Sequence, residues 1–223
     1  MKTSDISVDY LGGYGNDNTV ANAARVSFAK DASNYTDEQN EKLIRYLAKH
    51  KHTSPFNHAF LSFRVKAPIF VARQLVKHRF MPWNEESRRY VDEEPEFYIP
   101  TDWRAKADNV KQGSSDKIVD VLGMQGFFDR TPNSATQNLV QHSLDLYNEM
   151  LEHNVAPEMA RMVLPQNTMT NWIWSGTLGA FMDMLKLRLD PHAQYESRLV
   201  AQQIAETVEA LFPVSFKAIM ESN

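Results

Sequence analysis

The 223-residue sequence contains no cysteine. This absence excludes disulfides, thiolate metal sites and a cysteine nucleophile. Long apolar runs are also missing, since none approaches the roughly 20 residues of a membrane-spanning helix. The segment MKTSDISVDY at the N-terminus lacks the apolar centre of a secretory signal. We therefore expect a cytoplasmic protein with no membrane partner.

Positive charge is not in surplus, because the formal net charge is −4 at pH 7. This argues against general affinity for nucleic acid, which normally needs a basic surface. Three common motifs are absent as well: the phosphate loop G-x-x-x-x-G-K-[ST], the dinucleotide fingerprint G-x-G-x-x-G and the nucleophile turn G-x-S-x-G. Any nucleotide would therefore be bound by other means.

The chain shows no internal repeat and no Gly/Ser linker. Its hydrophobic fraction of 43% is ordinary for a globular protein, and we expect a single domain over residues 1–223. Residues 101–134 are polar and are predicted to form a mobile insertion, within which VDVLGMQGFF could pack as a short helix. Elsewhere helices dominate and a few strands accompany them, so the predicted fold class is α+β.

Apolar spacing predicts the individual elements. Residues 6–11 are a candidate strand, and the alternation of Leu61, Phe63 and Val65 with polar residues predicts a half-buried strand. One helix is predicted after a cap at Asn18 or Thr19, a second from a Thr36–Gln39 capping box to about His50, and a third over 68–79, with Pro68 in its first turn and Pro82 beyond its end. A fourth is predicted from its apolar side, which is formed by Leu139, Val140, Leu144, Tyr147 and Leu151. The last two are predicted over 177–188 and over 191–211, the latter with an apolar stripe of Leu199, Val200, Ile204 and Val208.

The segment KHRFMPWNEESRRY, residues 77–90, concentrates basic side chains in an acidic protein. Its residues FMPWNEES are predicted to form an ordered loop. Ser87 and Arg89 would point the same way in an extended segment, and Glu85 would orient an arginine or accept a sugar hydroxyl. Guanidinium and hydroxyl groups suit a phosphate or a carboxylate, so an anion site is the functional interpretation. A solvated charged face is the alternative.

Two further segments contain residue types used in catalysis. HTSPFNH, residues 52–58, has two histidines six apart without a carboxylate at ligand spacing, so a polar turn is favoured over a metal site. In LRLDPHAQYE, residues 187–196, Arg188 falls at a helix end, where a cation complements the dipole. His192 and Gln194 are predicted to open the next helix, whose free amides suit an anion or a ring carbonyl.

Together these motifs resemble the flavin-dependent thymidylate synthases. The hallmark of that family is a His-Arg pair, then seven residues, then serine, which here are His78, Arg79, FMPWNEE and Ser87. The resemblance continues in order through AARVSF, HTSPFNHAFLSFRVKAPIFVARQLVKHR, NEESRRY, EFYIP, ARMVLP and LRLDPHAQYE. Only residues 101–150 fall outside it.

The resemblance implies helices around a small, mostly antiparallel sheet and an enzyme that methylates dUMP to dTMP. Methylenetetrahydrofolate would supply the carbon, and NADPH would supply the reducing equivalents through FAD. Members of the family form homotetramers whose active sites are shared between subunits. The missing cysteine agrees with this resemblance, because the family activates the pyrimidine electrostatically and needs no thiolate.

The resemblance also assigns roles by position. Arg188 would be catalytic, stabilising negative charge on the uracil ring so that C5 becomes nucleophilic. dUMP would be bound by Gln74, Lys77, Glu85, Ser87, Arg88, Arg89, Arg161 and Arg188, with Ser87, Arg89 and Arg161 near its phosphate. The flavin would be bound by Ser54, Lys77, His78, Arg79, Glu85, Thr177, Gly179, Asp183 and His192, and His52 would border the pocket.

Several positions depart from the family pattern. Relatives usually have arginine at Lys77 and glutamate at Asn57. After the Trp-rich strand they show Asn-x-Arg and a further asparagine, where this sequence has Thr177, Gly179 and Asp183. These differences leave open a nucleotide-binding homologue with weakened or lost flavin chemistry. An RNA-binding module built on the Lys77–Arg89 cluster, with Trp83 as stacking platform, is a third interpretation, which the acidic net charge disfavours.

Overall fold

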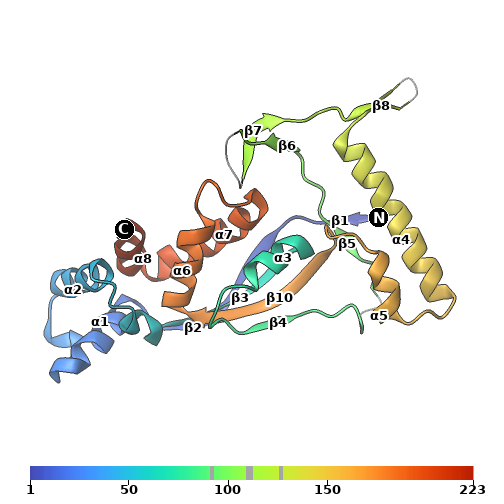
Figure 1. Cartoon of the computed structure of the whole chain (residues 1–223). Helices are drawn as coiled ribbons and strands as arrows, with labels where there is room; N and C mark the ends of the chain where they lie inside the picture. The colour runs from blue at the N-terminus through green and yellow to red at the C-terminus, as the bar shows by residue number, and fades with distance from the viewer. Residues whose placement is uncertain (91–92, 109–112, 126–127, 223) are drawn as a thin grey trace.

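A four-stranded antiparallel sheet forms the centre of the fold. The computed structural model describes residues 1–90, 93–108, 113–125 and 128–222. Within them the strand order is β2-β3-β10-β4, and each neighbouring pair is antiparallel. The strand bounds are Ser7–Tyr14 for β2, Phe60–Pro68 for β3, Met169–Thr177 for β10 and Trp83–Glu85 for β4. Helices pack around this sheet (Figure 1), which confirms the predicted α+β class.

Helices lie along the sheet and beyond both of its ends. In Figure 1, α1, α2 and α8 gather at the end where the chain finishes, whereas α4 lies far from them. The α-helices are α1 (Asp17–Arg25), α2 (Asp37–Lys49), α3 (Ile69–Leu75), α4 (Pro132–Glu152), α5 (Pro157–Ala160), α6 (Leu178–Arg188), α7 (Tyr195–Leu211) and α8 (Pro213–Glu221). Single 3₁₀ turns cover Val26–Phe28, Ala32–Asn34, Ser54–His58 and Arg161–Val163.

The register of β3 against β10 is fixed along their whole length, from Phe60 opposite Thr177 to Pro68 opposite Met169. The alternating apolar residues predicted for β3 are fully buried, which confirms that strand. If β3 paired with β10 one residue out of register, Leu61, Phe63 and Val65 would point away from the core. The core therefore also fixes where α3 leaves β3 and where α6 leaves β10.

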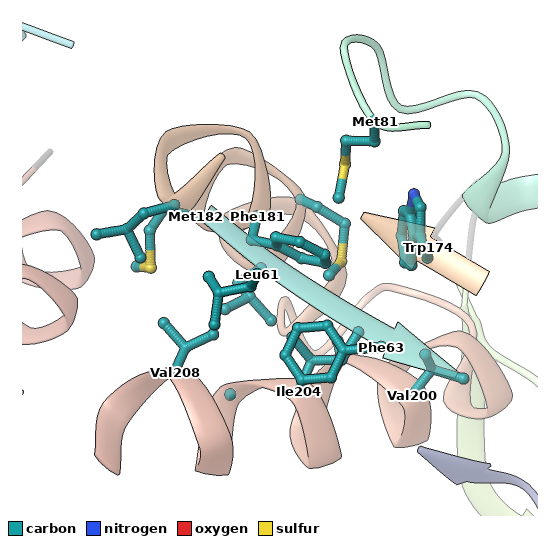
Figure 2. Packing of buried hydrophobic residues seen from close by; sticks show 14 of the residues in the cluster. Leu61, Phe63, Met81, Trp174, Phe181, Met182, Val200, Ile204 and Val208 are labelled. Carbon is teal, nitrogen blue, oxygen red and sulfur yellow. The ribbon is translucent and has the colours of Figure 1, made fainter. Parts of the chain in front are cut away.

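The main core lies between the sheet, α6 and α7. Figure 2 shows Leu61 and Phe63 of β3 close to the α7 residues Val200, Ile204 and Val208. Phe181 of α6 packs edge-on against Phe63, with ring centroids 5.1 Å apart. The predicted apolar stripe of α7 is therefore confirmed, except that Leu199 is only partly buried.

Two predicted helix starts have different outcomes. The Thr36 hydroxyl accepts from the Gln39 amide at 3.3 Å while the Thr36 amide donates to Gln39 Oε1 at 3.0 Å, so the capping box of α2 is confirmed. The cap predicted at Asn18 or Thr19 is wrong. Asn16 caps α1, since its Oδ1 accepts from the Thr19 amide at 3.2 Å and Thr19 Oγ1 accepts from the Asn16 amide at 3.1 Å.

The helix predicted over 68–79 is too long. α3 ends at Leu75, and Pro68 is the last residue of β3 rather than part of the first helical turn. The following turn includes Phe80, whose φ of 60° is unusual for a bulky residue. Lys77 therefore lies beyond the helix and does not share a helical face with Gln74.

The segment after Pro82 is not only a loop, because it contains β4, which pairs with β10. The Trp83 indole stacks on that of Trp172 with centroids 4.4 Å apart and an interplanar angle of 19°. Such offset aromatic packing adds to the strand pairing. The three residues of β4 are too few to show a period in the sequence.

Two hairpins occupy much of the segment 101–134. β6 (Arg104–Lys106) pairs with β7 (Ser114–Ile118), and β8 (Gly123–Gln125) pairs with β9 (Phe128–Arg130). The helix predicted for VDVLGMQGFF is therefore wrong in its described part, while residues 126–127 lie outside the described residues. The mobility of this segment stays a prediction. β1 (Lys2–Thr3) and β5 (Glu96–Phe97) form a separate parallel pair.

Two further predictions about helices need correction. On α4, Val140, Leu144 and Tyr147 are buried as predicted, but Leu139 is 61% exposed. The helix predicted over 191–211 begins only at Tyr195, because the preceding residues form a turn. Within the described ranges, no helix has both the length and the apolar character needed to cross a membrane.

Candidate active site

A cavity of about 820 Å³ opens between the end of α2, the first turns of α6 and the end of α8. Its remaining walls come from the 51–57 segment and the turn at 78–80. Six of the residues predicted from the sequence line it: His52, His78, Arg79, Thr177, Gly179 and Asp183. These residues come from three separate segments, which the fold brings to one place.

The cavity has a surplus of positive charge. Arg79, Lys51 and Lys186 line it, against one carboxylate from Asp183. Lys186 donates to the Ser222 carbonyl at 2.7 Å and to the Ser222 hydroxyl at 3.2 Å, which holds its ammonium group at the wall. Three cations suit a ligand with more than one negative charge, such as a diphosphate. Sequence reasoning missed both lysines, because neither belongs to a recognised motif.

Arg188 lies next to this cavity through its contact with His78. Arg188 Nε donates to His78 Nε2 at 3.1 Å, and Arg188 Nη2 donates to the Gln74 carbonyl at 3.3 Å. Within the described residues, Arg188 Nη1 has no hydrogen-bond partner. The guanidinium is therefore held on two sides and keeps one donor group for a ligand.

His78 is neutral in this arrangement. Burial, and secondarily the charge of Arg188, lower the pKa of His78 to about 4. Burial also lowers the pKa of Arg188 from its ordinary value. A neutral imidazole accepts a hydrogen bond at Nε2, which a protonated one cannot do. The pair therefore keeps one positive charge, on Arg188, near neutral pH.

The departures at Asn57, Thr177 and Gly179 are in mutual contact. Thr177 caps α6, since its hydroxyl accepts from the Ala180 amide at 3.2 Å, and the same hydroxyl donates to Asn57 Oδ1 at 2.8 Å. A Cβ added at Gly179 would lie 2.4 Å from Asn57 Oδ1. Asn57 thus occupies space that a side chain at position 179 would need, so the three positions expected to depart from the family pattern form one local set.

Two of the three residues predicted to bind the dUMP phosphate, Ser87 and Arg89, lie on a different part of the chain, in the turn after β4. The Arg89 side chain donates to Ser87 Oγ at 3.2 Å, and Arg88 Nη1 donates to the Glu93 carbonyl at 2.7 Å. Glu85 accepts from Trp83 Nε1 at 3.0 Å and from Thr170 Oγ1 at 2.9 Å. Within the described part of this single chain the Glu85 carboxylate bonds to a tryptophan and a threonine, and its predicted roles, orienting an arginine or accepting a sugar hydroxyl, stay predictions.

Four further predicted residues also lie outside the lining of the cavity. Ser54 begins a 3₁₀ turn, Lys77 is exposed beyond α3, and Arg161 is exposed in another 3₁₀ turn. His192 is exposed and does not open a helix, because Asp190 Oδ1 accepts from its backbone amide at 2.7 Å and contacts its ring at 2.9 Å. Their ligand roles stay predictions. Within the described ranges, no group of three metal-ligating side chains is present.

Residues 8–214 match the Thy1 family, described as "Thymidylate synthase complementing protein". The flavin-dependent thymidylate synthase of Thermosipho africanus is 39% identical over 207 residues, covering 93% of this chain and 87% of that protein. The enzyme of the same name from Thermus thermophilus is 40% identical over 207 residues, covering 93% of this chain and 73% of that protein.

A solved structure gives the same result for the fold. The UMP/dUMP methylase PolB of Streptomyces cacaoi, bound with 5-Br dUMP, superposes with a TM-score of 0.85 at 30% identity, covering 100% of this chain and 98% of that chain. Fold, site and relatives thus define an α+β enzyme of the thymidylate synthase class. The chain belongs to the flavin-dependent thymidylate synthase family.

Proposed function

We propose that this enzyme converts dUMP to dTMP with methylenetetrahydrofolate as carbon donor, NADPH as reductant and FAD as cofactor. In balance, the methylene carbon and the hydride equivalent of NADPH become the new methyl group, and tetrahydrofolate and NADP⁺ are released. The single observation that carries this proposal is the Arg188–His78 pair, because it holds a partly desolvated cation beside a cationic cavity of about 820 Å³.

Arg188 would stabilise the negative charge that develops on the uracil ring as N3 ionises. Burial strengthens such an electrostatic interaction, and a preorganised donor needs no reorientation during the reaction. His78 and the Gln74 carbonyl supply that preorganisation by holding two sides of the guanidinium. Arg188 Nη1 is the donor available to the ring.

Arg79, Lys51 and Lys186 fit the anionic part of the cofactor, because all three line the cavity. A bound flavin would supply the redox chemistry that the side chains of this protein lack. Lys186 follows Asp183 by one turn of α6, so its ammonium reduces the unfavourable field of that carboxylate towards a diphosphate.

Ser87, Arg89 and Arg161 would bind the dUMP phosphate, with Gln74, Lys77, Glu85 and Arg88 nearby. A homotetramer with shared sites would bring these residues to the cavity of another subunit. Phe80, next to Arg79 in the sequence, is 89% exposed, and Met162, next to Arg161, is 70% exposed. Burial of these two side chains against another subunit would favour assembly. Light scattering should therefore give the mass of four chains.

The experiment that tests the proposed function measures three quantities on the purified protein. The visible spectrum after FAD addition and removal of excess shows flavin retention, anaerobic NADPH shows flavin reduction, and product analysis shows dTMP formation. We expect all three. Absence of dTMP with both co-substrates present would contradict the proposal.

One observation favours a second candidate, a nucleotide-binding homologue with weakened flavin chemistry. Asn57 fills the space beside Gly179, where the family pattern leads us to expect an arginine side chain. This candidate predicts dUMP binding without retained flavin. The same spectrum therefore separates the two.

A further inference from the structure

We propose that Arg104 and Glu196 are positioning residues, which fix the orientation of the Gln74 amide in the substrate site. The inference rests on the proposed function, because Gln74 matters to turnover only if dUMP binds there. Neither Arg104 nor Glu196 belongs to the predicted site, and they lie 92 residues apart in the sequence.

The two residues form a largely buried ion pair. Arg104 Nη2 and Glu196 Oε1 are 2.7 Å apart, and their side chains are 18% and 8% exposed. Arg104 is held from two further sides, since its Nε donates to Ser114 Oγ at 2.9 Å and its guanidinium lies 4.0 Å from the centroid of the Tyr195 ring. Removal of either charge would leave the other buried without its partner, which is strongly unfavourable.

A chain of hydrogen bonds runs from this ion pair to Gln74. Glu196 Oε2 accepts from Gln194 Nε2 at 3.1 Å. Gln194 Oε1 accepts in turn from Gln74 Nε2, and Gln74 Oε1 accepts from the Ser197 hydroxyl at 3.1 Å. Each amide therefore donates towards Glu196 and accepts on its other side.

The charge of Glu196 explains this common direction. An ionised carboxylate can only accept hydrogen bonds, so the amide group of Gln194 must present its NH₂ to it. The Gln194 carbonyl then faces Gln74 and accepts from the Gln74 NH₂. The orientation of both amides thus follows from one buried carboxylate, which the ion pair with Arg104 holds in place.

The orientation matters because the chain of hydrogen bonds ends beside the catalytic cation. The backbone carbonyl of Gln74 accepts a hydrogen bond from Arg188. The side-chain amide of Gln74 has a second N–H, which can donate to a ligand. A neutral glutamine at position 196 can donate as well as accept, so Gln194 and Gln74 could then reverse. The site would then lose the N–H of Gln74 as a donor in a fixed position, while the volume and shape of the site would hardly change.

The experiment compares Glu196→Gln, Arg104→Met and Arg104→Lys with the unaltered, FAD-loaded enzyme. The readouts are the dissociation constant of dUMP, KM and kcat for dUMP, anaerobic flavin reduction by NADPH without dUMP, and thermal unfolding. Glu41→Gln is the matched control, because it removes an exposed carboxylate that pairs with Arg45 on α2, away from the site.

We expect Glu196→Gln and Arg104→Met each to raise the dissociation constant and KM of dUMP about tenfold, with a smaller change in kcat. Arg104→Lys should restore most of the affinity, because it keeps the charge beside Glu196. Flavin reduction without dUMP should stay normal in all variants, and Glu41→Gln should match the unaltered enzyme throughout.

Three results would overturn the inference. The first is unchanged dUMP affinity in both Glu196→Gln and Arg104→Met. The second is an equal loss of dUMP affinity in Arg104→Lys and Arg104→Met. The third is a loss of flavin reduction that accompanies the loss of dUMP affinity. Either of these two results would indicate a structural role alone. If Glu196→Gln does not fold, the two Arg104 variants still decide the matter. A failure of the unaltered enzyme to bind dUMP would instead refute the proposed function itself.

Discussion

The two ends of α6 hold their side chains in different ways. At the C-terminal end, Arg188 is partly buried and is bonded to His78 and to the Gln74 backbone. At the N-terminal end, the partly buried Thr177 donates to Asn57, which is exposed, so this bond lies at the protein surface. The departures from the family pattern that the sequence leads us to expect at Asn57, Thr177 and Gly179 all lie at this exposed end.

This difference indicates which parts of the site tolerate change. A guanidinium held on two sides has no substitute with the same geometry, because lysine lacks the planar fork. An exposed cap can be exchanged when its neighbour changes with it, since each hydrogen bond there contributes only about 1 kcal/mol. The side chain at position 188 is therefore restricted by its neighbours, whereas Thr177 and Asn57 at the cavity rim are restricted mainly by their fit to each other.

The largest expected effect is at the buried end. Arg188→Ala should leave the fold intact and lower dTMP formation by about a hundredfold to a thousandfold, the usual scale for losing a preorganised charge-stabilising group. The assay is dTMP formation with both co-substrates. Arg45→Ala, an exposed arginine of α2 outside the site, is the control and should turn over normally. Normal turnover by Arg188→Ala would remove the difference drawn between the two ends.

The second effect concerns pH. Because the pKa of His78 is about 4 in the folded chain against 6.5 ordinarily, the unfolded state binds a proton that the folded state does not between these values. The free energy of unfolding should therefore fall as the pH drops from about 6.5 to about 4. Below about pH 4 the contribution of His78 should no longer change with pH. The slope from one proton is at most about 1.4 kcal/mol per pH unit, and less after solvent screening.

Thermal unfolding from pH 7 to pH 4 measures this contribution. His78→Gln keeps an acceptor for Arg188 but does not titrate, so its stability should depend less steeply on pH. Carboxylates such as Asp190 and Glu96, whose pKa values are lowered by hydrogen bonds, remain in both proteins. Parallel curves for the two proteins would contradict the assignment.

The third effect is at the exposed end and compares two threonine caps. Thr177→Ala should cost about 1–2 kcal/mol, because it removes a helix cap and the bond to Asn57. Thr36→Ala should cost about 1 kcal/mol at the start of α2. Only the Thr177 variant should weaken FAD binding, measured by titration. Equal FAD affinity in both variants would mean that the rim does not bind the cofactor.

The smallest effect is at Gly179. Gly179→Ala should be nearly neutral for stability, because a helix gain of up to about 1 kcal/mol is offset when the new Cβ displaces Asn57 from Thr177. In an Asn57→Ala background, Gly179→Ala should raise the free energy of unfolding by the whole helix gain of up to about 1 kcal/mol. A double-mutant cycle by denaturant unfolding measures the coupling. Additive free energies would show that the two positions are independent.

Local patterns in the sequence predicted the parts of the fold that depend on neighbouring residues. The capping box at Thr36 and the alternation in β3 are examples, since each is complete within a few residues. β4 was missed because its pairing with β10 is decided by distant residues. The predicted helix over 191–211 ends where α7 ends, but α8 was missed because its nine residues are too few to show a clear apolar period.

The site divides in the same way. The family resemblance assigned His78, Arg79, Thr177, Gly179 and Asp183 to the flavin, and all five line the cavity. The contact between Asn57 and Thr177 spans 120 residues and leaves no local pattern. The ion pair between Arg104 and Glu196 was missed for the same reason.

The stacked indoles of Trp83 and Trp172 have a consequence for spectroscopy. Two aromatic rings 4.4 Å apart and inclined by 19° are close enough to couple their electronic transitions. Such coupling produces a paired band in circular dichroism that vanishes when the rings separate. Since Trp83 belongs to β4 and Trp172 to β10, this band would follow the attachment of the strand that carries Glu85, without any label or bound molecule.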